Sequence, residues 1–249
     1  MFSTSMRYAH FVVNNHSSLD YGIKITYPFD LSHSTVDISA TTIPGHSGDL
    51  LTNNHRYNNF TQTINILVQK PPRYTTWSQL AIDINNWLIS DNYRLFYFSN
   101  LGDWVLEGYL TQALTLKPQD DLQAIGTISL NCKPYMKRKD GLIFVPITTN
   151  TKIFNSEKES AEPILHVVGK GNIKIAINGN SYYLNNVADE IFIDSEQEWI
   201  YHHKFDENMA MHAIFPNNDF PKLLPGNNDI SISGKYTKFE YKANWRRLA

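Results

Sequence analysis

The sequence contains a single cysteine, Cys132, among its 249 residues, and it carries little net charge. One cysteine cannot form an internal disulfide, and it does not supply a cysteine-based zinc site. The formal net charge of −2 comes without a block of like charges. The chain therefore lacks the basic footprint with which proteins bind nucleic acid through its phosphates. We expect a protein that folds in a reducing cytoplasm and forms no stable complex with nucleic acid.

Long hydrophobic runs are also missing. No window approaches the ~20 apolar residues that a membrane-spanning helix needs. Residues 1–18, MFSTSMRYAHFVVNNHSS, lack the basic region and the apolar run of a secretory signal peptide. We therefore expect no membrane span and no export by the ordinary secretory route.

Aromatic residues, in contrast, are abundant, with 14 Tyr, 13 Phe and 5 Trp. Aromatic side chains favour strands, and apolar and polar residues alternate through most of the chain. This alternation predicts strands with one buried face at residues 22–29, 61–69, 93–100, 104–114 and 125–134, and then at 190–194, 198–203, 228–234 and 237–245. Residues 162–184 predict three further strands, separated by a Gly-Lys-Gly turn and by an Asn178-Gly179 turn.

One segment, residues 75–93, has helical rather than strand periodicity. Its apolar residues recur at a spacing of three or four and are Trp77, Leu80, Ala81, Ile84, Trp87 and Leu88. Thr75 or Thr76 is suited to be the N-cap. The sequence therefore predicts one amphipathic helix, packed against a sheet.

A basic, polar stretch, CKPYMKRKDG at residues 132–141, separates the two strand-rich halves. We therefore predict two domains, residues 1–140 and residues 141–249. The charged side chains of this stretch are Lys133, Lys137, Arg138 and Lys139. They are interpreted as a solvated linker, with a binding patch as the alternative.

The stretch TTIPGHSGDLLTNNHRYNNF at residues 41–60 contains His46, Ser47 and Asp49, which superficially suggest a hydrolase. A nucleophile elbow requires glycine two residues after the serine, whereas Gly48 follows Ser47 directly. His202 and His203 are adjacent on a predicted strand, so their side chains point to opposite faces and cannot share a metal ion. We therefore predict no catalytic residues, no metal site and no cofactor.

Several segments together resemble the distal tail (Dit) proteins of siphophages that infect Gram-positive bacteria. They are IPGHSGDLLTNNHRYNN (43–59), the WL pair (87–88), ISLNCKP (128–134), AEPILHVVGKGNIKIAING (161–179), IFIDSE (191–196), FPKLLPGNNDISISG (220–234) and NWRRL (244–248). The sequence departs from the family pattern at His46, where relatives often have arginine, and at His55, where they often have glycine.

The resemblance implies a mainly β fold: an N-terminal, β-sandwich-like belt domain with one α-helix and a long β-hairpin, followed by a C-terminal galectin-like β-sandwich. It implies the structural hub of a non-contractile phage tail tip, located in the virion after synthesis and assembly in the host cytoplasm. The chain would form a homo-hexamer around a channel through which DNA passes. Its partners would be the tail tube protein, a tail-associated or tail fibre protein, and a receptor-binding or baseplate protein.

In such a ring, residues 41–69 are suited to form an assembly arm: a long hairpin with a polar, asparagine-rich tip that reaches a neighbouring subunit. The subunit-interface candidates are Ile43, Leu50, Leu51, Tyr57 and Phe60 as packing residues, and Asp49 and Arg56 as polar contacts. The alternative is an ordinary hairpin that contacts only its own chain.

Two other classes of function remain open at this point. A carbohydrate-binding module for adsorption to the host surface could use Trp199, Tyr201, Tyr182 or Tyr183 as an aromatic platform. A tail-associated hydrolase would turn over cell-wall polymers and would lose activity on Asp49→Ala, although no motif supports it.

Overall fold

The computed structural model describes residues 8–202 and 207–249, and it divides the chain into two compact units. The first unit extends to Met136 and includes Leu248 and Ala249; the second comprises residues 137–247. The chain therefore passes from the first unit to the second and returns for its last two residues. The basic stretch that suggested a linker is itself strand β11 (Tyr135–Arg138) followed by the short helix η2 (Lys139–Leu142).

The first unit is built on a large sheet with the strand order β2-β1-β7-β8-β10-β6-β3. Its strands are β1 (Phe11–Val13), β2 (His16–Ser17), β3 (Ile23–Ile25), β6 (Phe60–Gln69), β7 (Arg94–Phe98), β8 (Trp104–Leu110), β9 (Lys117–Pro118) and β10 (Gln123–Cys132), joined by β11 and β21 (Arg246–Leu248). The short helix η1 (Ser18–Tyr21) precedes β3. The longest ladder joins β6 to β10, from Phe60 opposite Cys132 to Gln69 opposite Gln123. Alternate residues of β6 are buried, as the period-two pattern predicts.

The predicted helix is α1 (Trp77–Leu88). Thr76 is its N-cap, and the hydroxyl of Thr76 accepts a hydrogen bond from the backbone N–H of Gln79. Leu80 and Ile84 are buried in the core, whereas Trp77 is only partly buried. Trp87 stacks on Phe11 with ring centroids 5.6 Å apart and donates its indole N–H to the carbonyl of Val13.

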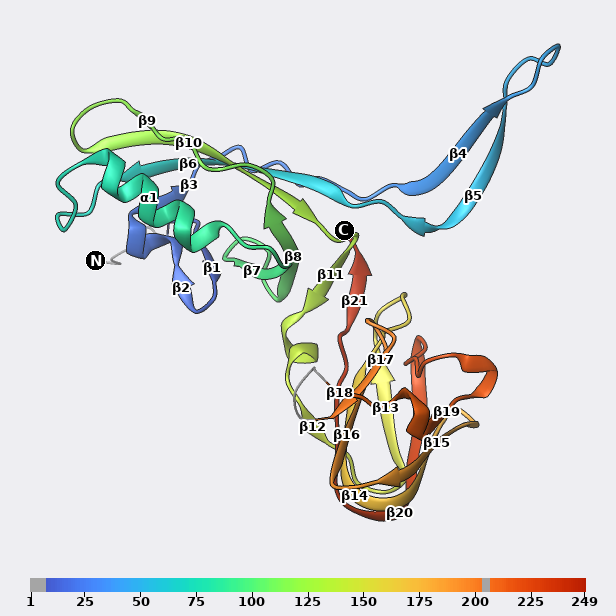
Figure 1. Cartoon of the computed structure of the whole chain (residues 1–249). Helices are drawn as coiled ribbons and strands as arrows, with labels where there is room; N and C mark the ends of the chain where they lie inside the picture. Colours follow the sequence, from blue (N-terminus) through green and yellow to red (C-terminus); the bar gives the residue numbers. More distant parts are fainter. Residues whose placement is uncertain (1–7, 203–206) are drawn as a thin grey trace, which may run out of the picture. The chain divides into compact units, whose positions relative to one another are not determined.

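Strands β4 (Val36–Thr42) and β5 (Asp49–Tyr57) form a two-stranded sheet of their own, the projecting hairpin of the first unit. Figure 1 shows this hairpin extending well beyond the strands that carry the core of its unit.

The second unit is a nine-stranded sheet in which two long, bent strands, β14 (Ile164–Ile177) and β20 (Gly226–Lys242), pair along most of their length. The other strands are β12 (Val145–Pro146), β13 (Thr151–Asn155), β15 (Asn180–Val187), β16 (Glu190–Asp194), β17 (Trp199–His202), β18 (Glu207–Asn208) and β19 (Ala213–Ile214), with short helices η3 (Ala210–His212) and η4 (Pro216–Asn218). Each of these long strands pairs with different neighbours in its two halves. The second half of β14 pairs with β15 and its first half with β16, whereas the first half of β20 pairs with β13 and its second half with β12. One sheet thus folds over into two layers that enclose a core.

The bend lies at Gly169 and Gly234, where the ladder between β14 and β20 changes register. An added Cβ would lie 2.5 Å from the carbonyl oxygen of Lys235 at Gly169, and 2.6 Å from that of Asn172 at Gly234. Glycine is required because the two backbones approach this closely. The predicted Gly-Lys-Gly turn is therefore wrong: the chain continues through it as one bulged strand, and residues 228–234 and 237–245 likewise belong largely to the single strand β20.

The predicted turn at Asn178-Gly179 is confirmed, with positive φ values of 52° and 86°. The fold class is also confirmed: the described residues form a mainly β structure with one α-helix and a long hairpin. None of the helices in residues 8–202 and 207–249 is long and apolar enough to span a membrane. The predicted placement of His203 lies outside the described residues.

Candidate functional site

The projecting hairpin is unusual because neither of its faces is covered by the rest of the described chain. Every residue of β4 and β5 is exposed or half-buried, and the two strands pair only with each other. The register places Ala40 opposite Leu51, Thr41 opposite Leu50 and Thr42 opposite Asp49. Both outer edges of the ribbon therefore lack a partner strand within the part of the chain that the structure describes.

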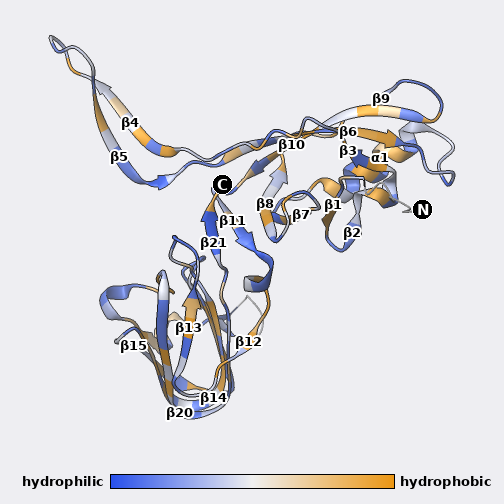
Figure 2. Cartoon of the chain, turned by 180° about the vertical axis from the view of Figure 1, so that it is seen from behind, coloured by the Kyte–Doolittle hydropathy of each residue, from blue (hydrophilic) through white to orange (hydrophobic). Residues whose placement is uncertain are grey.

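Apolar side chains lie on both faces of this hairpin. Successive residues of a strand point to opposite faces, so Leu50 lies on one face and Leu51 on the other. Leu50 is 56% exposed and Leu51 is 64% exposed. Ile38 shares the face of Leu51 and is 50% exposed. Figure 2 shows hydrophobic stretches alternating with polar ones along the hairpin.

The tip of the hairpin is formed by residues 43–48. Gly45 and Gly48 have φ values of +83° and +87°, and the backbone N–H of His46 donates to the carbonyl of Ile43. Ile43 is 40% exposed. The expected asparagine-rich tip is wrong, because the asparagines follow in β5 and at the base. Asp49 does not face a nucleophile: its carboxylate accepts a hydrogen bond from the hydroxyl of Thr42 on the opposite strand, at 2.8 Å.

The asparagines at the base anchor the hairpin to the first unit. The side-chain amide of Asn59 donates to the hydroxyl of Tyr93 and to the amide oxygen of Asn131, at 2.7 and 2.6 Å. The backbone N–H of Asn58 donates to the carbonyl of Thr35 at 2.8 Å. The base is therefore fixed by hydrogen bonds, whereas the apolar residues farther along the hairpin are left exposed.

Arg56 is partnered within the hairpin. Its guanidinium donates to the carboxylate of Asp37, which also accepts from the amide of Asn54. These hydrogen bonds, first that from Arg56 and then that from Asn54, hold the pKa of Asp37 below its usual value. The side chain of Arg56 is still 73% exposed, so the pair could be extended by a second acceptor.

His55 interrupts the regular ladder of β5. Its φ is +56°, and its backbone N–H donates to the side-chain oxygen of Asn53. The register shifts here, between the pairs Ile38 with Asn53 and Val36 with Tyr57. This backbone conformation is one that glycine adopts most easily, so a histidine at this position has a steric cost that a glycine would not have.

The remaining two interface candidates are less accessible. Phe60 is only 7% exposed and belongs to the core of the first unit, because it begins β6 rather than the hairpin. It is therefore corrected from an interface candidate to a core residue. Tyr57 is half-buried and meets Tyr135 edge to face, with ring centroids 5.8 Å apart.

Strand β4 is the part of this surface that the sequence prediction missed. Its segment VDISATT does alternate apolar and polar residues, but Ser, Thr and Asp are so frequent in it that the alternation is weak. The missed residues that matter are Asp37, which holds Arg56, and Ile38, which adds to the exposed apolar surface.

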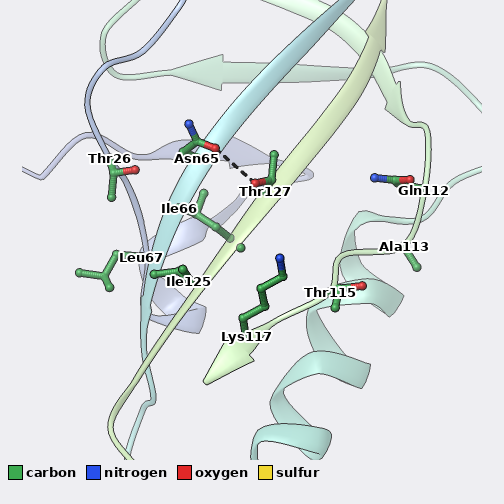
Figure 3. A pocket seen from close by; sticks show the side chains of 11 residues that line it. Thr26, Asn65, Ile66, Leu67, Gln112, Ala113, Thr115, Lys117, Ile125 and Thr127 are labelled. Carbon is green, nitrogen blue, oxygen red and sulfur yellow. Dashed lines mark hydrogen bonds between the residues drawn. The ribbon is translucent and has the colours of Figure 1, made fainter. Parts of the chain in front are cut away.

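A hollow of about 530 Å³ lies elsewhere in the first unit, beside β6 and β10. Figure 3 shows Thr26, Asn65, Thr127 and Lys117 around it, with a hydrogen bond between Asn65 and Thr127. Its lining contains hydroxyls, amides and one amine, but no carboxylate, imidazole or thiol. This lining does not supply the paired acid and base that hydrolysis requires.

Cys132 does not supply a nucleophile either. It is fully buried, and burial raises the pKa of its thiol to about 12. Within residues 8–202 and 207–249, no group of three His, Cys, Asp or Glu side chains is arranged to hold a metal ion.

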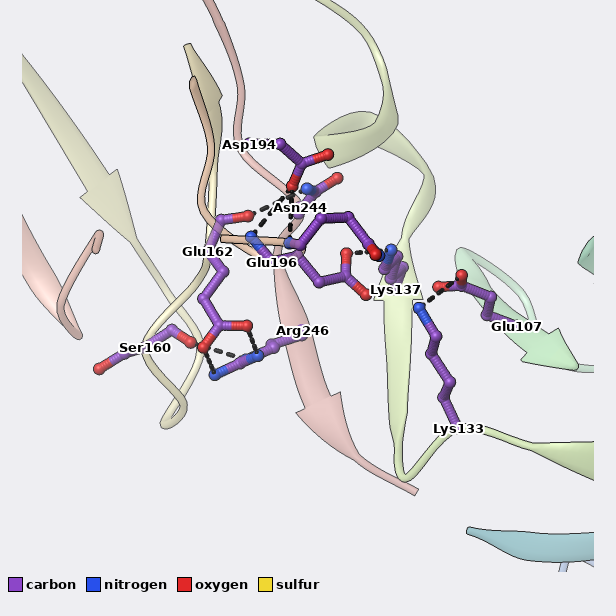
Figure 4. Close-up of polar contacts among 10 residues, drawn as sticks. Glu107, Lys133, Lys137, Ser160, Glu162, Asp194, Glu196, Asn244 and Arg246 are labelled. Carbon is purple, nitrogen blue, oxygen red and sulfur yellow. Dashed lines mark hydrogen bonds and ion pairs between the residues drawn. The ribbon is translucent and has the colours of Figure 1, made fainter. Parts of the chain in front are cut away.

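The basic residues near the predicted boundary form neither a solvated linker nor a free patch. Within the first unit, Lys133 pairs with Glu107 at 2.7 Å. Within the second, Lys137 pairs with Glu196 at 2.6 Å, and Arg138 contacts both Asp140 and Glu157. Figure 4 shows the pairs of Lys133 and Lys137, together with the two-pronged contact between Arg246 and Glu162. These charged side chains therefore form ion pairs within the protein.

Comparison with known proteins by sequence gives little: no family model matches the chain, and neither does any curated protein. Comparison with solved structures is more informative. The Dit protein of phage SPP1, described as a paradigm of the hub of the adsorption apparatus in phages that infect Gram-positive bacteria, superposes with a TM-score of 0.67 at 13% identity, covering 97% of this chain and 100% of that one.

A chain of the phage P2 baseplate, in its activated conformation with Ca, superposes with a TM-score of 0.57 at 11% identity, covering 98% of this chain and 99% of the other. Both similarities extend over both units. They show that this chain shares the fold of the SPP1 Dit protein and of the P2 baseplate chain.

Proposed function

We propose that this protein is the structural hub of a non-contractile phage tail tip. In this role it forms a hexameric ring that joins the tail tube to the baseplate and receptor-binding apparatus. The first unit serves as the ring-forming belt, and the second, galectin-like unit carries peripheral proteins. The protein works by assembly and not by catalysis, and it is located in the virion after synthesis in the host cytoplasm.

The observation that carries this proposal is the two-sided exposure of apolar residues on the projecting hairpin. An isolated two-stranded hairpin is marginally stable in water, and contiguous exposed apolar surface marks interaction sites. Leu50 and Leu51 would be buried on opposite faces only if another chain wrapped or sandwiched the hairpin. Within the described residues the outer edges of β4 and β5 have no partner strand, so their backbone groups can pair with a strand of a neighbour.

A hairpin that docks on a different surface of the next subunit makes a head-to-tail contact, and such contacts close into rings when the rotation fits. The absence of a basic stripe in the sequence agrees with DNA passing through the channel without being bound. The fold shared with an adsorption hub and a baseplate chain supports tube, fibre and receptor-binding proteins as partners.

The test is assembly of the purified protein, measured by negative-stain electron microscopy and mass photometry. Six-fold rings are expected for the wild type, and monomers for Leu50→Ser/Leu51→Ser. Leu122→Ser is a matched control, because Leu122 is also 64% exposed but lies outside the hairpin. Persistent wild-type monomers at high concentration, with no ring in the virion, would refute the hub. Rings that persist in the double variant would refute the role of the hairpin.

A further inference from the structure

The second unit contains a shallow pocket at the turn that connects β16 to β17. Its volume is about 240 Å³, below the ~300–1,000 Å³ of pockets that enclose drug-sized ligands. Its lining includes Gln197, Glu198, Trp199, Asn208 and Phe220. The size is suited to a single small ring rather than to a peptide or a nucleotide.

Trp199 provides an aromatic platform in this pocket. It is 39% exposed although it lies in a strand, directly opposite Asp194. Tyr201, itself buried, meets its indole edge to face, with centroids 6.3 Å apart and an interplanar angle of 74°. Phe220, held by an edge-to-face contact with Phe215 at 5.1 Å, forms another wall. An exposed tryptophan whose orientation is fixed by packing can stack against the apolar face of a ring.

The turn beside Trp199 is fixed by a buried carboxylate. Asp194 is 7% exposed, and its Oδ1 accepts hydrogen bonds from the backbone N–H groups of Glu196 and Gln197, both at 3.0 Å. The next residue, Glu198, has a φ of +50°. Gln197 and Glu198 therefore belong to a turn whose backbone is already organised, so little ordering is needed when a ligand binds.

Polar groups around the platform remain unused among the described residues. The side-chain amide of Gln197 and the carboxylate of Glu198 make no hydrogen bond there. Asn208 uses its amide oxygen to accept from the backbone N–H of Ala210 at 2.9 Å, which leaves its amide nitrogen as a donor. The pocket therefore offers both donors and acceptors next to an aromatic face.

We propose that this pocket binds one ring of a neutral saccharide. A hexopyranose presents a C–H-rich face that stacks on an aromatic ring, and its neighbouring hydroxyls each need a donor or an acceptor. Trp199 supplies the stacking surface, Asn208 and Gln197 supply donors, and Glu198 supplies an acceptor. None of the described residues that line the pocket is cationic, and the carboxylate of Glu198 disfavours phosphorylated or acidic sugars.

This inference does not rest on the hub function, since the pocket lies within the second unit and the hairpin within the first. The subunits can assemble into a ring without binding sugar, and the pocket can bind sugar in a protein that remains monomeric. The two proposals therefore fail separately.

Saturation-transfer difference NMR on the full-length protein tests the pocket. The probes are methyl glucopyranoside, methyl galactopyranoside and N-acetylglucosamine, with glucuronic acid as the charged comparison. At least one neutral probe is expected to bind with a Kd on the order of millimolar. Trp199→Ala is expected to weaken that binding about tenfold, because the stacking surface is lost.

Two further variants make the result specific. Phe154→Ala is a matched control, because Phe154 is an exposed aromatic of the same unit outside the pocket, and it should leave binding unchanged. Gln197→Ala removes a side chain without a structural hydrogen bond and should weaken binding severalfold, which keeps the test valid if Trp199→Ala does not fold. The proposal is overturned if no neutral probe binds, if both pocket variants bind as the wild type does, or if glucuronic acid binds equally well.

Discussion

The imidazole of His166 and the carboxylate of Glu240 face each other directly across β14 and β20, with Nδ1 2.8 Å from Oε1. The other ring nitrogen, Nε2, lies 2.9 Å from Oε2 of Glu190 on β16. His166 is 7% exposed and stacks on Phe192 with centroids 4.0 Å apart. A neutral imidazole has only one N–H donor, so two carboxylate contacts require one additional proton within this triad.

His166→Ala is therefore expected to destabilise the second unit by about 3 kcal/mol, because it removes the group between two largely buried carboxylates. Urea unfolding followed by tryptophan fluorescence measures the loss. His46→Ala, at the exposed hairpin tip, is the control and should be neutral. An unchanged midpoint in His166→Ala would show that the triad contributes nothing to stability.

Glu240 gives the second unit a predictable pH dependence. Burial raises the pKa of Glu240, but hydrogen bonds from Lys238 and His166 outweigh it and hold the pKa below the usual 4.5. A carboxyl whose pKa is lower in the folded state stabilises the fold above the unfolded pKa. This contribution is lost as the pH falls from about 4.5 through the folded value.

Glu240→Gln should therefore flatten the loss of stability below about pH 4.5, as measured by urea unfolding at successive pH values. Lys238→Met should raise the folded-state pKa of Glu240 toward its unfolded value and so shrink the loss of stability below about pH 4.5. Profiles that superpose with the wild type in both variants would contradict this assignment.

Gly234→Ala should destabilise the second unit by at least about 2 kcal/mol, because φ is +117° and the new Cβ would lie 2.6 Å from the carbonyl oxygen of Asn172. Gly171→Ala is the matched control. Its φ of +79° is also strained, but no atom lies within 4 Å of the new Cβ, so its cost should stay near 1 kcal/mol. Equal losses would mean that the close approach of the two strands is unimportant.

His55→Gly should stabilise the base of the hairpin by about 1 kcal/mol, because glycine adopts a φ of +56° without steric cost. Amide hydrogen exchange in β5 measures this effect locally. His55→Ala keeps the strained conformation and should exchange as the wild type does. Faster exchange in His55→Gly would indicate that the imidazole itself holds the bulge.

The sequence alone predicts those elements whose conformation is determined by residues close to one another in the chain. Thr76 and the apolar residues from Leu80 to Leu88 predict α1, and Asn178-Gly179 predicts its turn, because caps and turn conformations depend on neighbouring residues. The sequence did not distinguish a turn from a bulge at Gly169 to Gly171. That choice depends on whether a distant strand, β20, pairs on both sides of the bend.

The same dependence on distant parts of the chain limits what the sequence predicts about the candidate site. The sequence predicts Leu50 and Leu51 in a hairpin, where they do lie, but their exposure depends on whether another layer covers them, which alternation alone cannot reveal. Phe60 falls inside the predicted arm of residues 41–69, whereas the hairpin itself ends at Tyr57. In the structure the ladder between β6 and β10 begins at Phe60 and draws it into the core.

The course of the chain gives the second unit two covalent attachments, one after Met136 and one before Leu248. A single proteolytic cut in either connection leaves the two units joined through the other. Tension applied to the second unit is likewise divided between two chain segments instead of being carried by one.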